Sequence, residues 1–289
     1  MGFLTDWITD WLKELLISGI LGNLGGLFDN VNAQVGEIAV TVGMTPGAFN
    51  HGVFALIRTL SETVVLPIAG LLLTFVMTWE LIQMIIDQNN LHQLDTWIFF
   101  KWVFKTMIAV LILSNTFNIV MGIFDVSQHV VSGAAGVISG STDVNLNMLA
   151  ALEAELWLMD VGPLLGLWLQ SIIIGVIVLA LNVVVFVIIY GRMIEIFILT
   201  SLAPLPMATL TSHAMSGMGQ NYMKSMLAIG FQGLLIMVCV AIYAVLVQNI
   251  AVVGDPMGSV LTALCYTVLL CFTLFKTGSV AKAIFGAHG

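Results

Sequence analysis

The chain has 289 residues, of which 60% are apolar and 8% are charged, and its formal net charge is −8. Soluble domains are about 45–50% apolar and about 25% charged, so this composition excludes a water-facing globular surface. The 8 Lys and Arg residues form no cluster, which excludes direct, sequence-specific nucleic-acid binding by this chain.

Long unbroken apolar runs decide the fold class. The run 171–190 is an example, and it lacks the alternating polarity of a membrane-barrel strand. The sequence therefore predicts an all-α, polytopic helical membrane protein.

The first predicted element is an amphipathic helix near the N-terminus. Its apolar residues recur at helical spacing, and Trp7 and Trp11 are predicted to anchor it at the membrane interface. Packing of the same face on the protein's own core is the alternative. The glycines between Gly19 and Gly26 are expected to end this helix. A turn at 45–47 then precedes a short helix through Arg58.

Five apolar runs are long enough to cross a membrane: 63–86, 98–120, 163–190, 225–247 and 258–275. The segment 194–210 is apolar too, but it contains Pro204 and Pro206. Two prolines so close together remove backbone donors and clash with preceding carbonyls. We therefore expect 194–210 to be a broken, non-spanning segment.

The distribution of Lys and Arg sets the orientation. With five spans, six basic residues fall on one side and only Lys13 and Arg58 on the other, whereas a sixth span would divide them five to three. The positive-inside rule favours five spans, with the N-terminus outside and the C-terminus in the cytoplasm. The predicted organisation is an extracytoplasmic amphipathic region (1–60), two spans (61–121), an acidic extracytoplasmic loop with a short amphipathic helix at 147–159 (122–162), and a C-terminal membrane region with a cytoplasmic tail (163–289).

Chemistry-bearing motifs are absent from the sequence. The five histidines show no metal-ligand spacing, and no metalloprotease, nucleophile-elbow or phosphate-binding-loop motif occurs. We therefore predict no catalytic residue, no metal and no cofactor, and a protein that is not an enzyme.

A few polar residues stand in or beside the apolar helices, where they are costly and informative. The candidates for lining a pore or for contacting another subunit are Glu80, Asn115, Asn118, Arg192 and Glu195. Arg192 and Glu195 stand at i and i+3 and are close enough to pair. The alternatives are interfacial snorkelling for Arg192 and interhelical hydrogen bonding for the two asparagines.

The run 45–124 also carries a family resemblance. It includes the segments TPGAFNHGVFALIRTLSETVVLPIAGLLLTFVMTWELIQMI and LDTWIFFKWVFKTMIAVLILSNTFNIVMGIFD, and a later segment reads YGRMIEIFILTSLAPLPMATL. These segments resemble the TrbL-type conjugal transfer proteins of integrative elements in clostridia and relatives. That family is similar to the polytopic inner-membrane subunit of type IV secretion systems.

The resemblance implies an outside N-terminus, five spans and a long second extracytoplasmic loop, here 122–162. It also implies a non-enzymatic scaffold or channel subunit of a conjugative machine, assembled as a homo-oligomer in the cytoplasmic membrane of a Gram-positive bacterium. Its partners would be copies of itself, membrane lipid, and other secretion subunits, including pilin-like and ATPase components. The competing hypotheses are a stand-alone small-solute permease and a pore-forming membrane protein.

Overall fold

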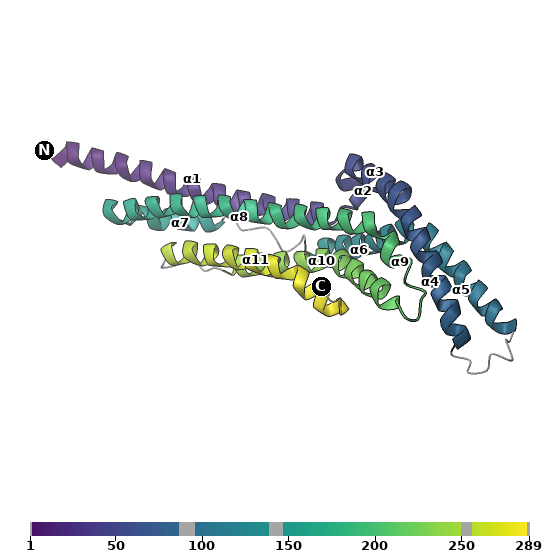
Figure 1. Cartoon of the computed structure of the whole chain (residues 1–289). Coiled ribbons are helices and arrows are strands. Elements are labelled where there is room, and N and C mark those ends of the chain that lie inside the picture. Colours follow the sequence, from purple (N-terminus) through teal and green to yellow (C-terminus); the bar gives the residue numbers. More distant parts are fainter. Residues whose placement is uncertain (1, 87–95, 139–146, 250–255, 288–289) are drawn as a thin grey trace. The chain divides into compact units, whose positions relative to one another are not determined.

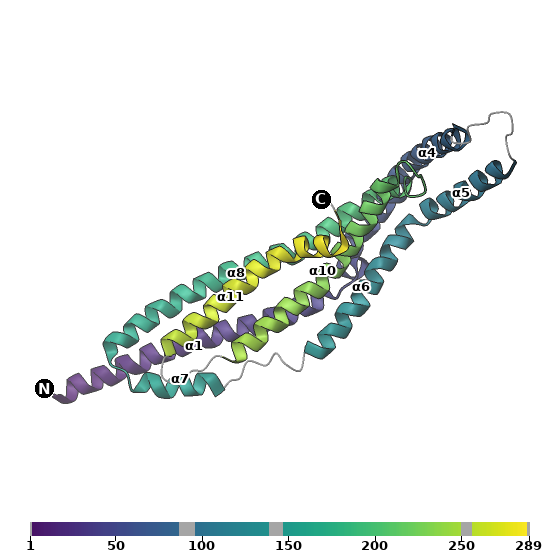
Figure 2. The same cartoon turned by 90° about the horizontal axis from the view of Figure 1, so that it is seen from below.

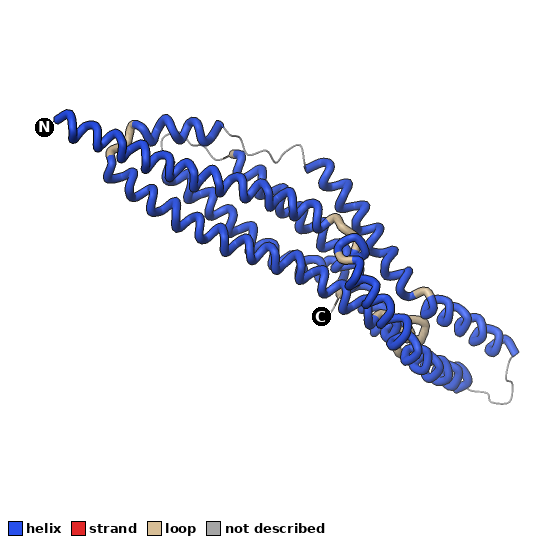
Figure 3. Tube along the Cα trace, turned by 90° about the horizontal axis from the view of Figure 1, so that it is seen from above, coloured by secondary structure: helices blue, strands red, loops and turns tan. Residues whose placement is uncertain are grey.

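The computed structural model describes residues 2–86, 96–138, 147–249 and 256–287. All regular secondary structure in these ranges is helical (Figures 1 and 3), so the predicted all-α class is confirmed. Each of the five predicted spans overlaps a helix that is long and apolar enough to cross a membrane. These helices cover His51–Ile86, Thr96–Ser114, Val161–Leu202, Ser216–Leu246 and Leu264–Phe285.

The helices in chain order are α1 (Gly2–Val42), α2 (Pro46–Phe49), α3 (His51–Leu60), the π-helical turn η1 (Ser61–Val65), α4 (Leu66–Ile86), α5 (Thr96–Ser114), α6 (Thr116–Ile138), α7 (Asn147–Trp157), α8 (Val161–Leu202), α9 (Pro204–Met207), α10 (Ser216–Gln248) and α11 (Pro256–Phe285). They form two compact units. Unit 1 consists of the described parts of 1–42, 132–189 and 235–276, and unit 2 of those of 43–131, 190–234 and 277–289.

In unit 1, α1 continues through the glycines that were expected to end it. At the first of them α1 packs closely against α8, because a Cβ on Gly19 would lie only 2.5 Å from Nε1 of Trp168. One turn further on, Asn23 Nδ2 donates a hydrogen bond of 2.9 Å to Ser171 Oγ. Glycine lowers helix propensity, but here it lets two helices approach closely, and the packing outweighs the propensity.

The apolar residues of α1 divide into two stripes. Leu16, Ile20 and Leu24 are buried, whereas Trp7 and Trp11 are exposed. The predicted packing on the protein's own core therefore applies to the middle of the helix. The exposed tryptophans stay free for the membrane interface or for another protein, and their role as anchors stays a prediction.

The rest of unit 1 is also helical. The predicted short helix at 147–159 is present as α7, which packs against α1. Figure 2 shows α10 and α11 side by side, and the hydroxyls of Tyr243 and Thr267 lie 2.9 Å apart between them.

Unit 2 begins with the predicted turn. Thr45 caps α2, because its Oγ1 accepts a hydrogen bond of 3.2 Å from the Ala48 N–H. The π-helical turn η1 then joins α3 to α4 just before Pro67. Proline has no N–H and its ring clashes with the carbonyl one turn back, so a wider turn before it is a common result.

The segment 122–162, predicted as a loop, begins instead with most of α6. The signal in its sequence is a buried helical stripe formed by Val120, Phe124, Ser127 and Val131, at spacings of four and three residues. The prediction of a loop rested on the acidic residues of this segment and not on this stripe. The location of 122–162 outside the membrane stays a prediction.

The segment 194–210 is broken where its prolines are, as predicted, but it is not separate. Its residues 194–202 are the last turns of α8, which ends at Leu202, and Pro204 begins the four-residue helix α9. Apart from Arg192 and Glu195, the sequence of α8 stays largely apolar into 194–202, and the helix continues until the first proline stops it.

The contact between Gly19 and Trp168 gives a testable prediction. Gly19→Ala should lower the thermal stability of the purified protein in detergent, because overpacking costs about 1–3 kcal/mol and the gain in helix propensity is only about 1 kcal/mol. Gly22→Ala on the same helix is the matched control, because a Cβ there meets no atom within 4 Å. It should leave the melting temperature unchanged or raise it. Equal shifts for the two variants would show that α1 does not pack on α8 in this way.

Candidate functional site

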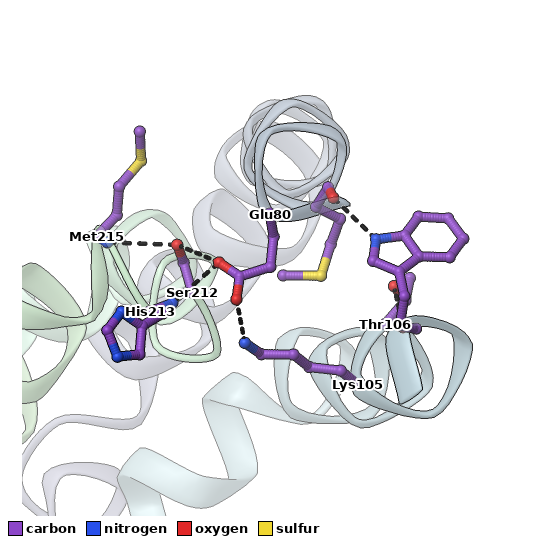
Figure 4. Close-up of polar contacts among 8 residues, drawn as sticks. Glu80, Lys105, Thr106, Ser212, His213 and Met215 are labelled. Atoms are coloured by element: carbon purple, nitrogen blue, oxygen red, sulfur yellow. Dashed lines mark hydrogen bonds and ion pairs between the residues drawn. The ribbon is translucent and has the colours of Figure 1, made fainter. Parts of the chain in front are cut away.

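A cluster of polar groups lies in unit 2 where α4, α5 and the turn after α9 meet (Figure 4). At its centre is Glu80, which is only 4% exposed. Its Oε1 accepts a hydrogen bond from Lys105 Nζ of α5, which forms an ion pair. A buried carboxylate needs such a partner, because removing a charge from water costs several kcal/mol.

The second carboxylate oxygen of Glu80 binds the turn. Oε2 accepts hydrogen bonds from Ser212 Oγ at 3.2 Å and from the backbone N–H of His213 at 3.0 Å. Ser212 Oγ in turn accepts a hydrogen bond of 3.3 Å from the Met215 N–H. One side chain therefore joins α4 to α5 through one oxygen and to the turn 208–215 through the other.

The local sequence explains why a turn lies here. Pro204 and Pro206 end the regular helical bonding, and the Ala203 N–H bonds to the Thr200 carbonyl, one residue closer than in an α-helix. The Leu199 carbonyl is satisfied from α10, because Tyr222 donates its hydroxyl at 3.1 Å. The irregular backbone thus finds partners within the protein, which is the condition that backbone at membrane depth must meet.

A glycine of α10 fixes how closely this turn is packed. A Cβ on Gly219 would lie 2.8 Å from the carbonyl oxygen of Pro206 and 2.9 Å from Cα of Leu210. Both neighbours are backbone atoms, which cannot rotate away as a side chain can. The first turn of α10 and the chain reversal are therefore in direct backbone contact.

Arg192 and Glu195, whose spacing is close enough for pairing, make contacts that lead to different helices. Arg192 is 7% exposed, and its Nε and Nη2 donate to the carbonyls of Ile229 and Gly230, each at 3.2 Å. This burial is the opposite of snorkelling to an interface. Glu195 pairs with Lys282 of α11 at 3.4 Å, on a half-exposed surface.

The two asparagine candidates lie at the junction of α5 and α6. Asn115 is exposed and donates from Nδ2 to the Leu111 carbonyl at 2.9 Å and to Ser114 Oγ at 3.3 Å, so these bonds are local rather than interhelical. Asn118 is exposed and lines a cavity in unit 2.

The five candidates thus do not form one site. Glu80 is the centre of a cluster, Arg192 holds α8 to α10, and Pro204 and Pro206 shape the turn. Sequence reasoning missed Lys105, Ser212 and His213 as partners of Glu80. Lys105 carried a signal, because it is a cation within an apolar helix that follows the helix of Glu80. Among the described residues no three His, Cys, Asp or Glu side chains gather as metal ligands.

The ion pair of Glu80 and Lys105 predicts an asymmetric effect of single substitutions. Lys105→Met leaves a buried carboxylate without its cation and should destabilise the protein by about 2–3 kcal/mol. This is below the ~3–5 kcal/mol of fully buried pairs, because the Lys105 side chain is 27% exposed.

Denaturant unfolding in micelles measures this change. Lys101→Met, at an exposed position one turn earlier on the same helix, is the control and should have little effect. The double variant Glu80→Gln/Lys105→Met should recover part of the loss, because the amide oxygen still accepts from the His213 N–H. If Lys101→Met and Lys105→Met cost the same, the pair contributes nothing to the fold.

Comparison with known proteins identifies one family. The family model for TrbL/VirB6 plasmid conjugal transfer-like proteins matches residues 31–204, which is more than half of the chain. No curated protein and no solved structure matches. The matched region includes Glu80, Lys105 and Pro204.

Proposed function

The chain belongs to the TrbL/VirB6 plasmid conjugal transfer-like family, and we propose that it is a non-enzymatic scaffold and channel subunit of a conjugative type IV secretion machine. Family membership and five apolar helices make it a membrane component of conjugal transfer. The finer proposal is a homo-oligomer in the cytoplasmic membrane of a Gram-positive bacterium, with the N-terminus outside and the C-terminus in the cytoplasm.

The main observation in favour of a homo-oligomer is the length of α8. The helix has 42 residues and is therefore about 63 Å long, whereas the hydrocarbon core of a bilayer is about 30 Å thick. About 20 helical residues are enough to cross that core, so α8 has about twice the length that one crossing needs. One bilayer cannot cover the whole helix.

Most exposed side chains of α8 are apolar, with the half-exposed Glu195 as a charged exception. Large exposed residues on this helix include Leu165, Leu169, Ile173, Val176, Val183, Val187, Ile194 and Ile198. Those within the bilayer face lipid, but those beyond it would face water unless another protein covers them. Neighbouring copies of the same chain are the simplest cover.

A conduit would also require several neighbouring copies of the chain. Five helices of one copy cannot enclose a passage wide enough for an unfolded protein or a DNA strand, so several copies must surround it. The low number of basic residues leaves the gripping of nucleic-acid phosphates to partner subunits. We place pilin-like and ATPase components among these partners, and lipid around the rim.

The exposed tryptophans of α1 provide the test. Loss of the chain from donor cells should abolish conjugal transfer, and the wild-type chain should restore it. Native mass measurement of gently solubilised wild-type protein should give a multiple of 31.2 kDa. Trp7→Ser/Trp11→Ser should shift the mass towards the single chain and lower transfer at least about tenfold, because it removes the large apolar contacts that dominate interfaces.

Ser18→Ala is the control, since Ser18 is exposed on the same helix and contributes little apolar area. It should leave both mass and transfer unchanged. A wild-type protein that is only monomeric would contradict the channel proposal, and the stand-alone permease would become the better account.

A further inference from the structure

A polar cavity of about 200 Å³ lies in unit 2, away from the cluster around Glu80. Side-chain oxygen or amide groups line it from two helical segments, at Ser61 and Glu62 on one side and at Ser114, Thr116 and Asn118 on the other. The remaining lining residues are apolar. The volume has room for several water molecules, each of which takes up about 30 Å³ in the liquid.

Three interruptions of helical structure meet at this cavity. One is η1, which provides Ser61 and Glu62, one is the turn at Asn115 between α5 and α6, and one is the break before Pro204, which also lines the cavity. The short helix α9 packs against η1, α4 and α5. Pro67 and Pro204 have no N–H groups to donate, so the regular helical bonding is interrupted near both residues.

One hydroxyl at the cavity needs a partner that the protein does not provide. Ser61 is 1% exposed, and its Oγ makes no hydrogen bond with any residue in the described part of the chain. Thr116, which is equally buried, donates to the Ile112 carbonyl at 3.0 Å. Because buried hydroxyls are nearly always bonded to protein or to water, the hydroxyl of Ser61 favours water in the cavity as its partner.

The mouth of the cavity is polar within an otherwise apolar surface. Glu62, Ser114 and Asn118 are exposed there, while Val64 and Leu111, in the same turns of their helices, are exposed and apolar. Polar side chains at membrane depth face water or other protein rather than lipid. Glu62 is paired with Arg58 at 2.9 Å, so the mouth has no uncompensated charge.

We propose that this cavity is a water-filled recess that opens to the aqueous interior of the assembled conduit. Ser61 lies at its bottom, and Ser114 and Asn118 line its mouth. The inference rests on the proposed function, because the interior belongs to the oligomer. It assigns one face of unit 2, formed by η1 and the α5–α6 junction, to the water side, and the adjacent apolar residues to lipid or to neighbouring copies.

Single cysteines test the recess in the assembled machine. In a background with Cys239, Cys265 and Cys271 replaced by Ala, the variants Ser61→Cys and Ser114→Cys are compared with Val64→Cys and Leu111→Cys. Each pair lies within one helical turn, so the two members share a membrane depth. The probe is a water-soluble methanethiosulfonate, applied to open membrane fragments from donor cells so that both membrane faces are accessible.

The two serine positions should react at least about tenfold faster than their apolar partners, because only a hydrated thiol forms the reactive thiolate. If Ser61→Cys reacts no faster than Val64→Cys, the recess is dry and the inference is wrong. Fast reaction in the chain expressed alone, with slow reaction in the assembled machine, would also overturn it, because a neighbour would then close the mouth. Transfer by each variant is measured in parallel, so loss of the recess is distinguished from failure of the proposed function.

Discussion

Backbone that leaves a helix at membrane depth must find hydrogen-bond partners within the protein or in enclosed water, and the turn between α8 and α10 is built around this constraint. Within that turn, Thr209 Oγ1 donates to the Pro206 carbonyl at 2.8 Å. Tyr222 satisfies a carbonyl of α8, and Glu80 accepts the His213 N–H. Because Glu80 is also paired with Lys105, the carboxylate that bonds to this turn also links α4 to α5 in unit 2.

The polar residues of the membrane helices therefore divide into two groups. Glu80 and Arg192 are buried and bind groups of their own subunit, so their charges contribute to the fold of a single copy. Ser114, Asn115 and Asn118 are exposed at a helix junction, and their polarity remains available to water or another subunit. Among these five residues, burial rather than residue type separates the groups that bind within the subunit from the candidates for the conduit.

The sequence was sufficient for the class, the number of apolar helices and the position of the proline break, because these follow from long apolar runs and from the missing proline N–H. It was insufficient where packing overrides local propensity. The helix α1 continues through its glycines, and at Gly19 the side chain of Trp168 packs directly against it. The partners of Glu80 also escaped prediction, because Ser212 and His213 lie more than 130 residues away in the chain and have no spacing that links them to it.

Hydrogen–deuterium exchange of the amides in 203–215, measured on the full chain in lipid nanodiscs, tests the central claim that this turn is an internally bonded part of the fold. The amides, that of His213 included, should exchange about as slowly as the adjoining ends of α8 and α10. Gly219→Ala should accelerate them on the order of tenfold by forcing α10 off the turn, while Gly217→Ala, where a Cβ meets nothing within 4 Å, should not. Fast, loop-like exchange in the wild-type protein, or the same exchange in both variants, would contradict the account.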